Sequence, residues 1–279
     1  MHIAGSVFLT EYSIGPAQLA TAMEERGYES LFLPEHTHIP VSRLTPYPGG
    51  GEMPSKYAHT YDPFVALTAA AMVTTTLRLA TGISLIAERD PITTAKVVAS
   101  LDFISGGRTL LGVGAGWNRE EMRHHGTDPR HRWAVLRERV QAMKAMWTHE
   151  EAEYHGDYVD FDASWSWPKP AQPGGPKILL GGNGPGILNR VVDYADSWMP
   201  ISGPTLATNV SELGRLAELG GRSDIGVTVV HTGPPEPRAF DSYAQLGVDR
   251  VVLLLPTACE TETLKKLDEW SAYAAEFTA

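Results

Sequence analysis

The amino-acid sequence predicts an α/β fold, a (β/α)8 TIM barrel with insertions after the second strand and before the fifth. Short β-branched or leucine-rich runs alternate with amphipathic stretches, which is typical of parallel strands connected by helices. This alternation occurs eight times in the chain, whereas open doubly wound sheets usually stop at about five to seven strands. Two of the expected strands also end in glycine-rich turns, and in a barrel these turns would share one rim.

The first four units are apolar runs that each lead into a helical pattern. Pro16, Pro63 and Pro91 stand at the expected starts of three of these helices, where the missing N–H of proline costs no hydrogen bond. We therefore expect strands at 3–8, 30–33, 77–84 and 109–114, and helices at 16–26, 63–75, 91–103 and 133–147.

The last four units repeat the pattern with shorter apolar runs. Pro237 stands at the start of one of their helices. The glycines before Gly186 separate the strand 177–180 from the helix that follows it. We expect strands at 177–180, 196–200, 226–230 and 250–255, and helices at 186–194, 205–219, 237–246 and 262–277.

Two long segments interrupt the alternation. Segment 34–60 is rich in proline and glycine and leaves the carboxyl end of a strand, so we expect it on the active face of the barrel. Segment 150–176 contains several aromatic residues and leads into the fifth strand. It either wraps the outside of the barrel or reaches over its top, and either segment could act as a lid.

The bulk composition limits the class of protein. The 279 residues, 43% hydrophobic and 20% charged, are enough for one large domain spanning 1–279. A net charge of −10 disfavours binding to nucleic acid and to anionic membranes. Cys259 is the single cysteine of the sequence, so no intrachain disulfide can form. We expect it to be a small buried side chain. The start of the chain has no signal-peptide pattern, and runs such as 251–255 are too short to cross a bilayer, so we expect a soluble, cytoplasmic protein.

The fourth strand ends in the glycine-rich turn formed by Gly114, Ala115, Gly116, Trp117 and Asn118. Backbone N–H groups of such a turn can approach an anion at the start of a helix. A dinucleotide-binding fingerprint would need a further glycine where Trp117 stands, so we reject Rossmann-type binding. The alternative is that these glycines only make a tight turn between strand and helix.

A second turn of this kind follows the fifth strand. It consists of Gly181, Gly182, Asn183 and Gly184 and stands directly before a helix. Consecutive small residues leave their N–H groups exposed as a nest for an anion. No Walker lysine follows either turn, which argues against a nucleoside triphosphate.

An H-x-H pair, His36 and His38, follows Glu35 at the end of the second strand. Such a pair can bind a metal ion in barrel hydrolases, so a metal-dependent TIM-barrel hydrolase is a lower-ranked alternative. The sixth and eighth strands end at Pro200 and Pro256, which supply no further ligand. We therefore expect no metal site.

Several motifs occur together, in order, along nearly the whole chain. Together they resemble the luciferase-like monooxygenase family, and within it the branch of probable oxidoreductases that depend on coenzyme F420, an 8-hydroxy-5-deazaflavin. The motif around the fourth strand is the most specific of them. The motifs are Glu35-His36, Thr81-Gly82-Ile83-Ser84, Arg89-Asp90-Pro91, Leu101-Asp102, Ser105-Gly106-Gly107-Arg108, Gly112-Val113-Gly114-Ala115-Gly116-Trp117 and the segment 176–184.

The resemblance implies a cofactor site at the mouth of the barrel. It implies a ring lying in the mouth, with its phosphate tail held by the loops 114–118 and 181–184. It also implies a cis peptide bond between Gly82 and Ile83, behind the ring.

The resemblance further implies the residues around the substrate. His36 matches a histidine that lies against the deazaflavin, and it would bond to the ring or protonate the substrate; alternatively it only packs its loop. Sugar-phosphate dehydrogenases of the family place a glutamate where this chain has Trp117, which suggests a flatter, more apolar substrate. Phe8, Arg89 and Trp117 are expected pocket walls. Arg89 could pair with an anionic substrate or with a neighbouring carboxylate, and Trp198 could be a pocket wall or barrel core.

The sequence therefore predicts an oxidoreductase that transfers a hydride between F420 and a small organic molecule. The alternative with the same fold is an FMN-dependent luciferase-like monooxygenase. A ligand-binding barrel without catalytic activity is a third class. The family also implies a homodimer formed through outer helices of the barrel.

Overall fold

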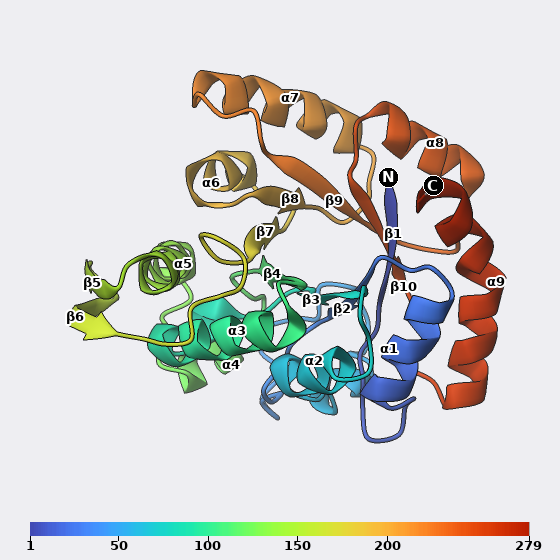
Figure 1. Cartoon of the computed structure of the whole chain (residues 1–279), viewed down its shortest axis with the longest axis horizontal. Helices are drawn as coiled ribbons and strands as arrows, with labels where there is room; N and C mark the ends of the chain where they lie inside the picture. The colour runs from blue at the N-terminus through green and yellow to red at the C-terminus, as the bar shows by residue number, and fades with distance from the viewer. Residues whose placement is uncertain (279) are drawn as a thin grey trace.

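The computed structural model describes the backbone of residues 1–278 and the side chains of residues 1–274, and within this range eight parallel strands close into a barrel (Figure 1). Each barrel strand pairs with the next one along the chain, and the last pairs with the first. The predicted TIM barrel is confirmed. Its strands are β1 (His2–Ser6), β2 (Ser30–Leu33), β3 (Arg78–Thr81), β4 (Thr109–Val113), β7 (Lys177–Gly181), β8 (Ser197–Met199), β9 (Gly226–His231) and β10 (Arg250–Leu254).

Helices surround the barrel, as the alternation predicts (Figure 1). Side-chain caps fix the starts of two of them: Asp62 accepts from the amides of Phe64 and Val65, and Asp90 accepts from that of Thr93. The helices are α1 (Pro16–Glu25), α2 (Pro63–Ala71), α3 (Pro91–Ser105), α4 (Arg119–His124), α5 (Arg132–Thr148), α6 (Ile187–Tyr194), α7 (Leu206–Leu219), α8 (Pro237–Gln245) and α9 (Glu260–Thr278), with short 3-10 turns η1 (Ser55–Ala58) and η2 (Ile86–Glu88).

The two insertions lie in different places. Segment 34–60 returns to the barrel at the carboxyl end of β1, where Thr10 and Thr60 form an isolated bridge. Segment 150–176, expected as a long loop, instead contains an antiparallel hairpin of β5 (Glu151–His155) and β6 (Asp160–Trp165). The hairpin lies outside the barrel beside α5, so β4 pairs directly with β7 (Figure 1). Of the two positions expected for this segment, the structure has the outer one.

The segment between α2 and β3 is held by two polar side chains. Arg108 donates five hydrogen bonds, to oxygens of Ser105 and of residues 71, 74 and 77. The carboxylate of Glu24 accepts from the amides of residues 75–77. Because these amides bond to Glu24, helix α2 ends earlier than the 63–75 pattern predicts.

The apolar core has two layers. The larger layer lies between the strands and the surrounding helices. The smaller one fills the inside of the barrel and is capped by the partly buried Ile83 and Val230. Its members come from seven strands: Ala4, Phe32, Ala80, Leu110, Leu179, Met199 and Val252. The barrel is thus closed by side chains below its mouth.

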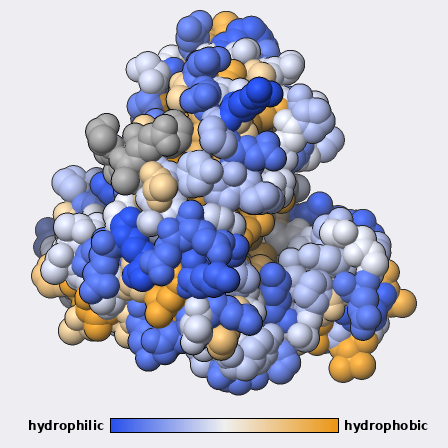
Figure 2. Space-filling model, turned by 90° about the vertical axis from the view of Figure 1, so that its right-hand side faces the viewer, coloured by the Kyte–Doolittle hydropathy of each residue, from blue (hydrophilic) through white to orange (hydrophobic). Residues whose placement is uncertain are grey.

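The surface drawn in Figure 2 is mainly hydrophilic, with hydrophobic residues in separate small groups and at the base of a hollow. No helix among the described residues is long and apolar enough to cross a membrane. The expected cytoplasmic location stays a prediction. Cys259 is exposed, so the expected buried side chain is wrong, because the residue lies in the turn that leads into α9.

Candidate active site

The carboxyl ends of four strands bring the predicted site residues to one rim of the barrel. His36 follows β2, Gly82 and Ile83 follow β3, and the turns 114–118 and 181–184 stand at the ends of β4 and β7. In a parallel barrel these ends meet at the same face. The peptide bond between Gly82 and Ile83 is cis, as the family resemblance implies.

The side chain of Ile83 forms an apolar floor for the barrel mouth. It packs against the cluster inside the barrel and is partly exposed on its other side. A Cβ atom on Gly114 would lie 2.6 Å from Ile83 Cδ1, and one on Gly181 would lie 2.8 Å from Ile83 Cγ2. A larger residue at either position would push the Ile83 side chain out of its place, so glycine backbone borders the floor. A planar ring fits such a surface.

The turn 181–184 is fixed at one side and open at the other. Asn183 bonds to the backbone of Ile201 through both its amide oxygen and its amide nitrogen, at 2.9 and 2.8 Å. Trp198 is fully buried, and its Nε1 donates to the carbonyl of Gly182 at 2.9 Å. Trp198 is therefore barrel core that supports the turn. Gly184 is exposed, with no atom within 4 Å of its ideal Cβ position, so a ligand can approach its backbone.

The turn 114–118 leads directly into α4. Asn118 is buried, and its side chain caps the helix by accepting from the amide of Glu121 at 3.4 Å. Gly116 has a φ of 73°, a conformation that favours glycine. Ala115 is buried within the turn, and the half-buried Trp117 points toward the residues described next.

His36 forms a buried pair with a residue that the sequence did not single out. Its Nδ1 lies 2.8 Å from Oε2 of Glu121, and the two side chains are 6% and 0% exposed. A carboxylate can only accept, so the proton of the neutral imidazole stands on Nδ1. This leaves Nε2 of His36 as the nitrogen that can bond to a bound molecule.

Aromatic rings surround His36 on its open side. The ring of Tyr57 lies 5.3 Å from that of His36 and 4.6 Å from that of Phe8. Trp117 lies 5.8 Å from His36, and Tyr47 lies 6.0 Å from Trp117. Both tyrosines come from segment 34–60, and their hydroxyls lie 3.1 Å apart. The predicted walls Phe8 and Trp117 thus join an aromatic enclosure that the insertion completes.

A buried acid lies below the turn that follows β4. Glu88 is 5% exposed, and neither of its carboxyl oxygens has a hydrogen-bond partner among the described residues. Burial, followed by the charges of Glu121 and Glu35, raises the pKa of Glu88 to about 9. Glu88 is therefore protonated at neutral pH.

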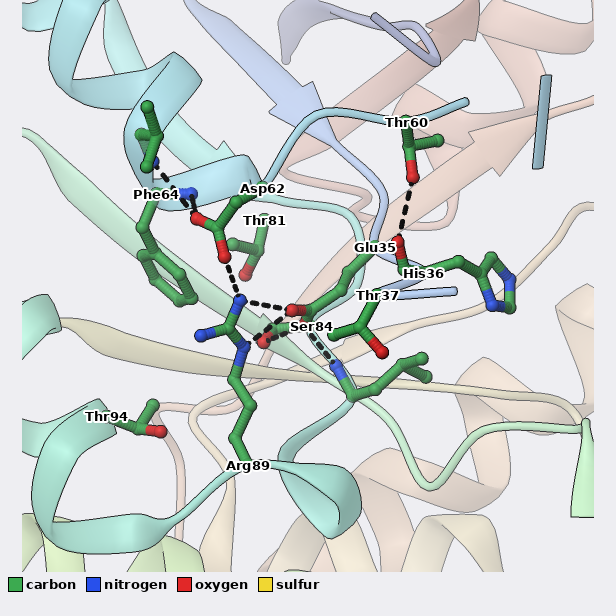
Figure 3. A network of polar contacts seen from close by, with 12 residues as sticks. Glu35, His36, Thr37, Thr60, Asp62, Phe64, Thr81, Ser84, Arg89 and Thr94 are labelled. Atoms are coloured by element: carbon green, nitrogen blue, oxygen red, sulfur yellow. Dashed lines mark hydrogen bonds and ion pairs between the residues drawn. The ribbon is translucent and has the colours of Figure 1, made fainter. Parts of the chain in front are cut away.

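Arg89 forms ion pairs with carboxylates of the protein itself. Its guanidinium pairs with Glu35 and Asp62, and Glu35 also accepts from Ser84 Oγ and the amide of Leu85 (Figure 3). Of the two roles considered for Arg89, the structure shows the pairing with neighbouring carboxylates. In Figure 3 the Glu35 side chain points toward Arg89, whereas the ring of His36 points away from it.

The two histidines of the H-x-H pair have different partners. His36 bonds to the buried Glu121, whereas Nε2 of His38 lies 2.8 Å from Nδ1 of the exposed His124. Over the part of the chain that the structure describes, no three His, Cys, Asp or Glu side chains are arranged to hold a metal ion.

Four residues of the site were not identified from the sequence: Glu121, Glu88, Tyr47 and Tyr57. Glu121 had one available signal, because it stands three residues after Asn118, the spacing of a helix cap and the amide that it binds. Tyr47 and Tyr57 lie in the segment that was expected on the active face. Nothing local marks Glu88, whose role depends on which carboxyl groups the fold places around it.

Comparison with known proteins places these features in a family. The family model described as luciferase-like monooxygenase matches residues 16–247. An uncharacterized protein of Mycobacterium tuberculosis is 37% identical and covers 100% of this chain and 98% of its own length. An F420-dependent glucose-6-phosphate dehydrogenase of Nakamurella multipartita is 29% identical and covers 69% of this chain and 54% of its own length.

Two solved structures show the same fold at low sequence identity. The coenzyme F420 dependent tetrahydromethanopterin reductase of Methanopyrus kandleri matches with a TM-score of 0.74 at 16% identity, covering 97% of both chains. The oxygenating constituent of 3,6-diketocamphane monooxygenase of Pseudomonas putida, in complex with FMN, matches with a TM-score of 0.66 at 19% identity. That match covers 83% of this chain and 67% of the other. With a family model that spans most of the barrel, the chain belongs to the luciferase-like monooxygenase family and is an oxidoreductase of that class.

Proposed function

We propose that this oxidoreductase transfers a hydride between coenzyme F420 and a small organic substrate at the mouth of the barrel. The observation that carries the proposal is the apolar floor of Ile83, bordered by glycine backbone, with His36 near it on the same rim. Relatives named as F420-dependent dehydrogenases support the choice of cofactor.

The residues of the mouth fit a cofactor with a planar ring and an anionic tail. Gly82 and Ile83 would support the ring, and the turns 114–118 and 181–184 would hold the tail through backbone N–H groups. When bound, F420 supplies or accepts a hydride as a two-electron carrier.

His36 would hold or move the proton that accompanies the hydride. Its Nε2 is the available nitrogen, because Nδ1 is bonded to Glu121. Glu121 is a positioning residue: it fixes the tautomer of the imidazole and the direction of its ring. Both residues are buried, so the proton would be exchanged with the substrate rather than with bulk water.

The aromatic enclosure would select the substrate. Phe8, Tyr57 and Trp117 offer flat apolar surfaces, and Trp117 cannot donate a proton as a carboxylic acid could. Tyr47 and Tyr57, which belong to the insertion, would exclude water from the mouth. We therefore propose a flat, largely apolar substrate rather than a sugar phosphate.

FMN is the alternative cofactor, and with it the enzyme would be a monooxygenase. The likeness in fold to the FMN complex supports this alternative. The same rim of the barrel would hold either cofactor, so a titration with both, side by side, separates the two proposals.

The variants His36→Ala and Glu121→Gln test the role of the buried pair. With F420 and a panel of alcohols, aldehydes and enones, we expect His36→Ala to slow turnover at least about tenfold while keeping the circular dichroism of the wild type. Glu121→Gln keeps an acceptor at the same place, so we expect a smaller loss together with a shifted pH profile. An unchanged rate in His36→Ala would exclude a catalytic role for His36.

We also propose that the active form is a homodimer. Helices α2 and α3 and the turn after α2 expose large apolar side chains, which is unusual for a surface that faces only water. Their exposed fractions are 70% for Val65, 70% for Met72, 45% for Val73, 44% for Ile92, 60% for Phe103 and 53% for Ile104. A second copy of the chain would bury them.

A further inference from the structure

A basic cavity lies on the outside of the barrel, beside the rim that carries the proposed cofactor site. Its volume is about 590 Å³, and it is formed by α4, the turn after α4 and the start of α5. Four of its eight lining residues are arginines. The lining consists of Arg119, Arg123, Gly126, Thr127, Asp128, Pro129, Arg130 and Arg132.

Three of these arginines have no ion-pair partner among the side chains that the structure describes. Asp128, the single carboxylate of the lining, is bound to Arg130. Arg132 donates from Nη1 to the carbonyl of Pro129 at 2.8 Å, while its Nε is buried without a partner. No ion pair joins Arg119 or Arg123 to a carboxylate, although the charge of Glu120 acts on Arg123.

The local charge is opposite to that of the whole protein. The chain carries a net charge of −10, whereas the lining of this cavity has four basic groups and one acidic group. A concentration of unpaired guanidinium groups against that background favours an anionic ligand. Guanidinium groups bind carboxylates and phosphates with two parallel hydrogen bonds.

A second cavity lies between the basic cavity and the turn that follows β4. Its volume is about 400 Å³, and it shares Arg119 and Arg132 with the first. Gly116 and Trp117 line it on the side of the turn after β4. On the side of the insertion it is lined by Leu44, Thr45, Pro46 and Pro48. An extended molecule that passes the turn 114–118 can therefore reach the arginines.

We propose that the basic cavity binds the carboxylates of the glutamate tail of F420. The inference rests on the proposed function, because F420 carries glutamate residues beyond its phosphate group. FMN ends at a single phosphate, for which the glycine-rich turns alone would suffice. A cavity with three unpaired arginines matches a ligand with several negative charges.

Three ligands that differ by one part each test this inference. They are the deazaflavin without phosphate, F420 without glutamates, and F420 with several glutamates. Dissociation constants from quenching of tryptophan fluorescence are measured for the wild type and for the double variant Arg123→Gln/Arg132→Gln. Arg215→Gln serves as the control, because Arg215 is an exposed arginine of α7 outside the cavity lining.

We expect the glutamate tail to tighten binding to the wild type at least about fivefold at low salt, and less at high salt. The double variant should lose this difference while binding F420 without glutamates as the wild type does. Arg215→Gln should retain it. Because the variant could fold poorly, a poly-γ-glutamate peptide is also tested on the wild type, where it should compete with the tailed form only.

Equal binding of F420 with and without glutamates by the wild type would overturn the inference and leave the proposed function intact. A tail effect that survives in the double variant would also overturn it, because other residues would then bind the tail. If none of the three deazaflavins binds, the proposed function falls and the inference falls with it.

Discussion

Replacing Glu88 with glutamine should make the stability of the protein less dependent on pH. The wild-type carboxyl group is buried without a hydrogen-bond partner, and its pKa is about 9 compared with 4.5 for an ordinary glutamate. Between these two values the folded protein binds one more proton than the unfolded chain. The wild type therefore loses stability as the pH rises from 4.5 to about 9. The stabilising contribution of Glu88 is greatest below pH 4.5.

The size of the effect follows from the proton balance. One group contributes at most about 1.4 kcal/mol per pH unit, or about 4 kcal/mol over three units. The guanidinium of Arg139 favours the charged form of Glu88, and the pKa of about 9 already includes this effect. We expect the free energy of unfolding of Glu88→Gln, relative to the wild type, to rise by at least about 2 kcal/mol between pH 5.5 and pH 8.5.

Urea titrations followed by tryptophan fluorescence at three pH values measure this difference. Glu218→Gln is the control, because Glu218 is exposed on α7 and should give a difference that does not change with pH. A constant difference between Glu88→Gln and the wild type across the range would refute the assignment of a protonated acid below the turn after β4.

Three further predictions concern the fold and the assembly. Arg108→Met should lower the free energy of unfolding by about 3 kcal/mol in urea titrations, because it leaves buried oxygens of the segment 71–77 without donors. Glu24→Gln should destabilise by about 2 kcal/mol at pH 7, a value reduced for the solvent screening of this carboxylate, and by little near pH 2, as thermal unfolding would show. Burial opposes the charge of Glu24, but bonds from the amides of residues 75–77 outweigh it and lower its pKa to about 2, so the wild-type advantage disappears as the pH falls from 4.5 toward 2. Phe103→Asp should convert a dimer to a monomer in light scattering, and a wild type that is already monomeric would contradict the proposed dimer.

The barrel was predictable because its strands are short apolar runs separated by helices with strong start signals. Pro16, Pro63, Pro91 and Pro237 each stand at the first position of a helix in the structure. The hairpin in segment 150–176 was not predictable in this way. Its second strand, Asp160–Trp165, alternates polar and apolar residues but is exposed at nearly every position, so it has no continuous apolar run like those of the buried barrel strands.

Helix α4 was missed for a similar reason. It is six residues long and strongly charged, so it has no apolar periodicity to detect. Its start depends on the side chain of Asn118, which the family resemblance places in the cofactor site rather than at a helix cap. The helix matters for the site, because it carries Glu121 and two arginines of the basic cavity.

The candidate site was predictable where a residue stands at the end of a strand. His36 and the glycines of the two turns follow from this rule alone. The partners of these residues could not be predicted, because they come from distant parts of the chain. Glu121, for example, is 85 residues from His36. The pairing of Arg89 with Asp62 likewise depends on how α2 is placed beside the rim.

A side-by-side titration of the purified protein with F420 and FMN tests whether the mouth of this barrel holds a deazaflavin. Quenching of tryptophan fluorescence reports binding, since Trp117 lines the proposed site. We predict saturable binding of F420 with one molecule per chain and an affinity for FMN at least about tenfold lower. Tighter binding of FMN would favour the FMN-dependent monooxygenase instead, and binding of neither cofactor would contradict a flavin or deazaflavin site in the mouth of the barrel.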